Sequence, residues 1–111
     1  MTAWEGDTVW ASTLIRSGKR GWETPPGLYR TFLKIPKEDM TLGDPSDPDY
    51  YYTPNVPWVM YFRDGGYAIH GAVWDAAWGT PTSHGCINTP VDLAAELYDW
   101  APLGTLVWIH H

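Results

Sequence analysis

The sequence predicts a single β-rich domain, a small sandwich or barrel of short strands with one helix. Apolar runs of strand length alternate with turn sequences rich in glycine and proline, and only one segment has a helical pattern. The chain has 111 residues, which suits one domain over residues 1–111 and is too short for two independent cores. A count of elements that is mostly strand favours two packed layers of sheet.

Six stretches of apolar or alternating residues are expected to be strands, namely residues 2–4, 8–15, 28–32, 58–62, 67–70 and 105–109. Gly6-Asp7 and Asp64-Gly65 each stand between two of these stretches and predict tight hairpin turns. This reading places His70 at the end of a core strand.

One segment near the C-terminus has the pattern of a helix. Thr89 is expected to cap it, with Pro90 in its first turn. Leu93, Leu97 and Trp100 are spaced to lie on one face, and the proline and glycine that follow end the helix.

Residues 36–57 have a different character, with acids, prolines and three consecutive tyrosines at 50–52 but no clear period. We expect a long ordered loop that forms part of a lid, because loops of this length in small domains usually have a function.

Net charge and hydropathy exclude several kinds of partner. Seven Lys and Arg against thirteen Asp and Glu give a formal charge of -6, which argues against nucleic acid and against binding to anionic membranes. No apolar run approaches the roughly 20 residues of a membrane-spanning helix, so no membrane insertion is expected in this segment. The first residues lack the basic start and apolar run of a signal peptide.

The candidate chemistry lies in two segments, IHGAVW at residues 69–74 and TSHGCIN at residues 82–88. Cys86, the lone cysteine, could attack a carbonyl carbon if an imidazole took its proton, since a free thiol with a pKa of about 8.5 is mostly protonated at neutral pH. The Gly85 and Cys86 N–H groups could then bind the oxyanion, because glycine lets a carbonyl approach closely. Local reasoning leaves open whether His70 or His84 is the base.

Two alternatives compete with this reading. A cysteine is often only a small buried hydrophobe, and His70, His84 and Cys86 are also zinc-ligand types. No second cysteine or acidic residue is spaced to complete a metal site, so we expect no metal. Most of the eight tryptophans are expected to pack in the core.

Ser-His-Gly-Cys-Ile-Asn at residues 83–88, preceded by His-Gly-x-x-Trp at 70–74, resembles the signature of the L,D-transpeptidase catalytic domain, the YkuD family. SGK at 17–19, TPPGLY at 24–29 and NVPWVMYF at 55–62 extend the similarity over residues 2–109. The resemblance implies a β-sandwich of mixed sheets with one helix. The family usually opens with one more strand, so a fragment or compact variant that lacks this first strand is expected.

The resemblance also implies roles for nine residues. Cys86 would be the nucleophile and His70 the general base, with the backbone carbonyl of Gly71 setting the imidazole tautomer. Three further residues would shape the oxyanion hole and its turn, namely Ser83, His84 and Gly85. The remaining three would bind substrate together with Ser83, namely Asn88, Trp74 and Met60.

The function implied is acyl transfer on peptidoglycan stem peptides outside the cytoplasmic membrane, in the periplasm or cell wall. A thioester on Cys86 would form with release of D-Ala, and a neighbouring stem amine would resolve it into a 3→3 cross-link. Carbapenem-type inhibitors would react at the same thiol. An L,D-carboxypeptidase that uses water as acceptor, and a non-catalytic cell-wall binding module, remain as alternatives.

Overall fold

The computed structural model describes residues 1–42, 44–46, 48, 50–72, 78–79, 83 and 85–110. Its strands are β1 (Thr2–Glu5), β2 (Thr8–Ser12), β3 (Gly27–Arg30), β4 (Leu33–Leu42), β5 (Tyr51–Arg63), β6 (Tyr67–Gly71), β7 (Ile87–Thr89) and β8 (Leu106–Ile109). The helix α1 (Val91–Trp100) lies between β7 and β8.

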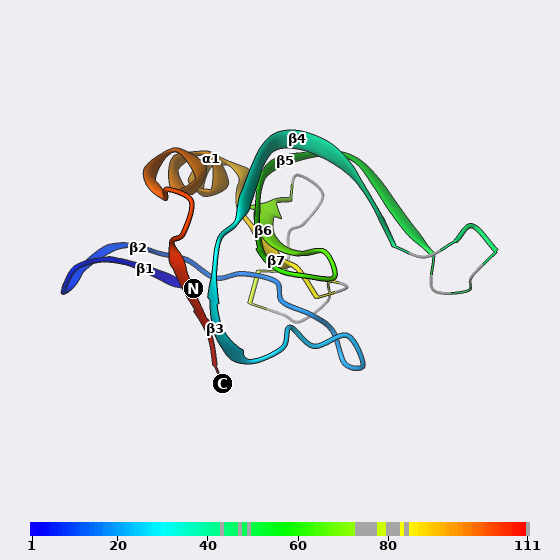
Figure 1. The fold of residues 1–111 in the computed structure, drawn as a ribbon, viewed down its shortest axis with the longest axis horizontal. Coiled ribbons are helices and arrows are strands. Elements are labelled where there is room, and N and C mark those ends of the chain that lie inside the picture. The colour runs from blue at the N-terminus through cyan, green and yellow to red at the C-terminus, as the bar shows by residue number, and fades with distance from the viewer. Residues whose placement is uncertain are drawn as a thin grey trace.

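The main sheet has the strand order β4-β5-β6-β7, and two smaller sheets pair β1 with β2 and β3 with β8 (Figure 1). Only β6 and β7 run parallel, and the other pairs are antiparallel. A parallel pair needs a crossover rather than a hairpin, and residues 72–86 supply it. The expected mostly-β fold with mixed sheets and one helix is therefore confirmed.

The two faces of the main sheet carry different side chains. On the first face Met60, Ile69 and Ile87 form a buried cluster with Leu97 of α1, and partly buried residues of β1, β2, β3 and β8 pack against it. On the second face Val59 and Ala68 form a separate buried cluster that contacts Tyr61 and Cys86. The division follows from the pleat, because successive strand residues point to opposite faces.

Trp58 interrupts this alternation within β5. Its φ of 55° is a left-handed conformation that is uncommon for a large side chain. Val56 and Val59 consequently pack in one cluster despite their odd spacing, while the Trp58 ring lies 5.3 Å from that of Tyr98 on α1. The irregular backbone thus links the main sheet to the helix.

Residues 36–57, expected to be a long loop, lie mostly in strands. β4 and β5 pair from Leu33↔Tyr61 out to Leu42↔Tyr51, and Figure 1 shows them as a curved ribbon that extends away from the rest of the chain. The expectation of a loop was wrong because each stretch has its backbone hydrogen bonds satisfied by the other, which no single-segment period reveals. Pro36 is tolerated because β4 is an edge strand.

The helix begins at Val91 with Pro90 as its cap residue, so the expected capping role of Thr89 was wrong. The Thr89 hydroxyl instead donates to the backbone oxygen of His70 at 3.0 Å, which joins the end of β7 to β6. Among the expected apolar positions of the helix, Leu97 is buried while Leu93 and Trp100 are half-buried.

The tryptophans do not form the core that their number suggested. None of the seven that the structure describes is fully buried, and Trp4 and Trp108 are 57% and 67% exposed. A groove of about 1300 Å³ borders the first face of the main sheet between β1, α1 and β8, and Trp4, Trp100 and Trp108 line it. In the part of the chain described, no helix has the length and apolar character needed to cross a membrane.

Candidate active site

His70 is positioned by the main sheet. It pairs with Asn88 in the parallel β6–β7 register and is only 2% exposed. Its Nδ1 lies 2.9 Å from the backbone oxygen of Gly71. A carbonyl oxygen can only accept, so Nδ1 carries the proton and the neutral ring has its lone pair on Nε2. This is the tautomer that a base acting through Nε2 requires.

Gly71 is needed for close packing as well as for its carbonyl. A Cβ at this position would lie 3.1 Å from Cγ of Pro57 and 3.4 Å from Cβ of Ala94. The backbone of β6 therefore approaches both β5 and α1 closely, and this packing holds the carbonyl that orients His70.

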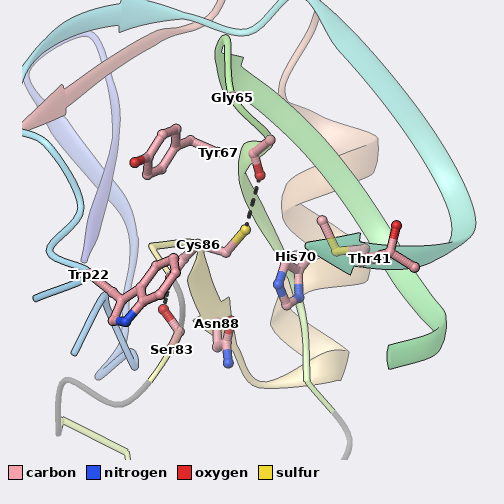
Figure 2. Close-up of a pocket in the computed structure, with 10 residues that line it drawn as sticks. Trp22, Thr41, Gly65, Tyr67, His70, Ser83, Cys86 and Asn88 are labelled. Atoms are coloured by element: carbon pink, nitrogen blue, oxygen red, sulfur yellow. Dashed lines mark hydrogen bonds between the residues drawn. The ribbon is translucent and has the colours of Figure 1, made fainter. Parts of the chain in front are cut away.

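Cys86 lies immediately before β7, with its thiol directed to the turn that joins β5 and β6 (Figure 2). Sγ donates to the backbone oxygen of Gly66 at 3.3 Å. Burial raises the pKa of the Cys86 thiol to about 11; the Glu38 carboxylate adds to this rise and the Ala68 N–H opposes it. Burial thus disfavours the thiolate, and the thiol donates a hydrogen bond to Gly66.

Both groups line one pocket of about 110 Å³ on the second face of the sheet (Figure 2). Four of the residues expected in the site meet there, namely His70, Ser83, Cys86 and Asn88. Six lining residues were not expected, namely Trp22, Met40, Thr41, Gly65, Gly66 and Tyr67. Two sequence features could have identified part of this second group. The hairpin signal at Asp64-Gly65 precedes the strand of His70, and residues 36–57, expected to form part of a lid, contain Met40 and Thr41.

Ser83 stabilises the turn that carries Cys86. Its Oγ donates to the backbone oxygen of Cys86 at 2.6 Å and accepts from the N–H of Gly85 at 3.2 Å. The Gly85 N–H, which we expected to bind the oxyanion, is therefore engaged within the turn.

Gly85 has a conformation and a neighbour that exclude other residues. Its φ is +114°, and a Cβ would lie 2.6 Å from Cε1 of Tyr67. A side chain at this position would both strain the backbone and displace the tyrosine ring from the pocket.

Residues 16–24 form a second support, which we call the N-terminal clamp. Arg16 and Asn88 exchange backbone hydrogen bonds of 2.8 and 3.0 Å. Ser83 donates to the Ser17 oxygen and accepts from the Lys19 N–H, both at 2.9 Å. The clamp therefore contacts the chain on both sides of Cys86.

Gly18 explains why the clamp contains a Ser-Gly-Lys sequence. A Cβ on Gly18 would lie 1.9 Å from the backbone oxygen of Trp22, a distance that no side chain permits. The close return of the chain brings Thr24 under Gly18 and Trp22 to the rim of the pocket.

Met60, one of the expected site residues, does not join this group. Met60 is 2% exposed in the cluster on the first face, so it does not line the pocket beside Cys86, where Met40 of β4 lies instead. The pleat accounts for this difference, because neighbouring residues of β5 face opposite sides of the sheet. Trp74 and His84 lie outside the described residues.

The zinc alternative finds no support in the described residues, among which no group of three or more His, Cys, Asp or Glu side chains could hold a metal ion. His84, the third ligand type proposed for zinc, lies outside the described residues. His70 and Cys86 alone would leave a tetrahedral zinc site half filled.

Comparison with known proteins identifies relatives over nearly the whole chain. Residues 1–109 match the family model described as the L,D-transpeptidase catalytic domain, YkuD. L,D-transpeptidase 2 of Mycobacterium tuberculosis (strain CDC 1551 / Oshkosh) is 30% identical over 95 residues, which are 81% of this chain and 23% of that protein.

Solved structures give the same result. An L,D-transpeptidase from Mycobacterium smegmatis is 31% identical with a TM-score of 0.86, over 95% of this chain and 51% of the other. L,D-transpeptidase 3 from Mycobacterium tuberculosis, in complex with a faropenem-derived adduct, is 28% identical with a TM-score of 0.81, over 88% of this chain and 44% of the other. The chain thus spans about half of these structures or less, and under a quarter of the curated relative.

Proposed function

Because this chain belongs to the L,D-transpeptidase catalytic-domain (YkuD) family, whose members are enzymes, we propose that it transfers acyl groups between peptidoglycan stem peptides with Cys86 as nucleophile. One observation carries the proposal. A thiol and a buried imidazole line the same small pocket, and the imidazole is held by Gly71 in the tautomer of a base.

In the first half of the reaction, Sγ of Cys86 attacks the carbonyl carbon of the third residue of a stem tetrapeptide. The S–C bond forms, the C–N bond to the terminal D-Ala breaks, and the thiol proton passes through Nε2 of His70 to the departing amine. Burial raises the pKa of the thiol and so disfavours the thiolate, and His70 takes the thiol proton as the S–C bond forms.

In the second half, a side-chain amine of a neighbouring stem attacks the thioester. The N–C bond forms, the S–C bond breaks, and His70 returns the amine proton to sulfur, which gives a 3→3 cross-link. The substrate of such an enzyme lies outside the cytoplasmic membrane, in the periplasm or cell wall, and no cofactor takes part in either half.

A β-lactam tests the nucleophile directly. The solved relative with a faropenem-derived adduct is an L,D-transpeptidase, and we propose that a penem or a carbapenem acylates this chain in the same way. Intact mass spectrometry is expected to show one adduct, on Cys86, and none with the Cys86→Ala variant. A folded wild-type protein that forms no adduct would favour the non-catalytic binding module.

The acceptor needs a second experiment with a stem tetrapeptide. Release of D-Ala together with a cross-linked dimer supports the transpeptidase. Release of D-Ala with a free tripeptide alone, in the presence of an amine acceptor, would identify an L,D-carboxypeptidase instead.

A further inference from the structure

We infer that Thr24 is a positioning residue for the oxyanion hole: its hydroxyl holds the Gly85–Cys86 peptide so that the Cys86 N–H faces the carbonyl under attack. The inference rests on the proposed function and concerns a residue of the N-terminal clamp, 62 positions before the nucleophile (86 minus 24).

The Thr24 hydroxyl is fixed on both sides. Thr24 is 7% exposed, accepts from the Gly18 N–H at 3.1 Å and donates to the Gly85 backbone oxygen at 2.7 Å. The hydroxyl has a single hydrogen, and it is donated to the Gly85 oxygen. Gly85 cannot turn its carbonyl away without leaving this buried donor unpaired.

The direction of the Cys86 N–H follows from peptide geometry. The described chain has no cis peptide bond, and in a planar trans peptide the C=O and N–H point in opposite directions. Thr24 borders the large groove, whereas Cys86 lines the small pocket on the other side. A Gly85 carbonyl held toward Thr24 therefore directs the Cys86 N–H toward the pocket.

The Cys86 N–H matters for the oxyanion because the neighbouring Gly85 N–H is already engaged. Gly85 N–H donates to Ser83, so it does not point at an incoming acyl group. Within the described residues, the Cys86 N–H has no hydrogen-bond acceptor of its own. A preorganised N–H aimed at the developing charge is the arrangement that stabilises a tetrahedral intermediate.

The test compares two reactions of the same thiol. Acylation by a β-lactam passes through an oxyanion, whereas alkylation by iodoacetamide is a displacement at a saturated carbon and does not. Thr24→Val removes the hydroxyl with little change of shape, and we expect its acylation rate constant to fall by about tenfold or more. Its alkylation rate is expected to stay within about twofold of wild type, and Thr24→Ser is expected to restore acylation.

Thr31→Val is the matched control. Thr31 is 4% exposed and also accepts one backbone N–H, from Thr105, while donating to one backbone oxygen, of Pro102. It lines the large groove but not the pocket of Cys86, so its loss should lower the melting temperature and leave acylation unchanged.

Three outcomes would overturn the inference: Thr24→Val acylates at the wild-type rate, acylation and alkylation fall together, or Thr31→Val loses as much acylation as Thr24→Val. If Thr24→Val does not fold, the same ratio of rates is measured on Thr24→Ala at reduced temperature. Failure of wild-type protein to acylate at all would count against the proposed function rather than against the role of Thr24.

Discussion

His70 and Cys86 line the same pocket but are held there by different kinds of structure. His70 lies within β6, whose neighbours β5 and β7 both pair with it, and its ring is oriented by the adjacent Gly71. Cys86 lies outside the strands, on a turn held by Ser83 and by the N-terminal clamp. The difference suggests that defects near His70 should cost mainly stability, whereas defects near Cys86 should cost mainly reactivity.

The largest effect should come from His70 itself. His70→Gln removes the base while keeping a polar side chain, and acylation by a penem is expected to fall by about 100-fold or more. The measurement is the rate of adduct formation by intact mass. His84→Gln is the matched control, since local sequence reasoning could not choose between the two histidines. A larger loss with His84→Gln than with His70→Gln would reassign the base.

A pair of threonines tests the comparison most directly. The Thr89 hydroxyl donates to the His70 backbone oxygen, much as the Thr24 hydroxyl donates to that of Gly85. Thr89→Val is expected to lower the free energy of unfolding by about 1–3 kcal/mol, because a fully buried hydrogen bond is lost.

Its acylation rate is expected to stay within a few fold of wild type, since the ladders on both sides of β6 still hold His70. Denaturant unfolding and the penem assay give the two quantities on the same samples. If the acylation rate of Thr89→Val falls as far as that of Thr24→Val, His70 and Cys86 are not held by different kinds of structure.

The smallest effect concerns the charge near the thiol. Glu38 accepts a hydrogen bond from Tyr61, and its carboxylate contributes to the raised thiol pKa. A negative charge disfavours the thiolate, so Glu38→Gln should lower the pKa of Cys86 below about 11 while keeping an acceptor for Tyr61.

The pH profile of iodoacetamide alkylation measures this shift. The rate should rise with pH toward the thiol pKa, and the Glu38→Gln profile should lie at lower pH than that of wild type. Asp39→Asn changes a neighbouring carboxylate that contacts Asn55 and Tyr52 instead, and its profile should match wild type. A Glu38→Gln profile at higher pH would contradict the assigned cause.

The local features of the chain were predictable from residue order alone. Turn residues at Gly6-Asp7 and Asp64-Gly65 predicted two hairpins, and four residues of the motifs at 70–74 and 83–88 line the pocket, namely His70, Ser83, Cys86 and Asn88. The hairpins depend on contacts within a few residues of one another, and each motif is a short run, so a linear reading contains them; the parallel pairing of β6 with β7 brings the two motifs together.

Contacts between distant segments could not be read in this way. The pairing of β4 with β5 made strands of an aperiodic stretch, and the left-handed Trp58 changed which β5 residues face Cys86. Met60, expected in the site, lies on the other face of the sheet, and Met40 of β4 lines the pocket instead, because a strand residue's face depends on register and bulges rather than on its type.

The sequence by itself determined the fold class and the family, and it predicted Cys86 and His70 as the candidate reacting pair, since the motifs that carry them are short runs of residues. Only the tertiary structure decided that burial raises the pKa of the Cys86 thiol and that the turn carrying Cys86 is held by a threonine 62 positions earlier (86 minus 24). Burial and hydrogen bonds between remote segments exist only once the chain has folded, and they control how these side chains can react.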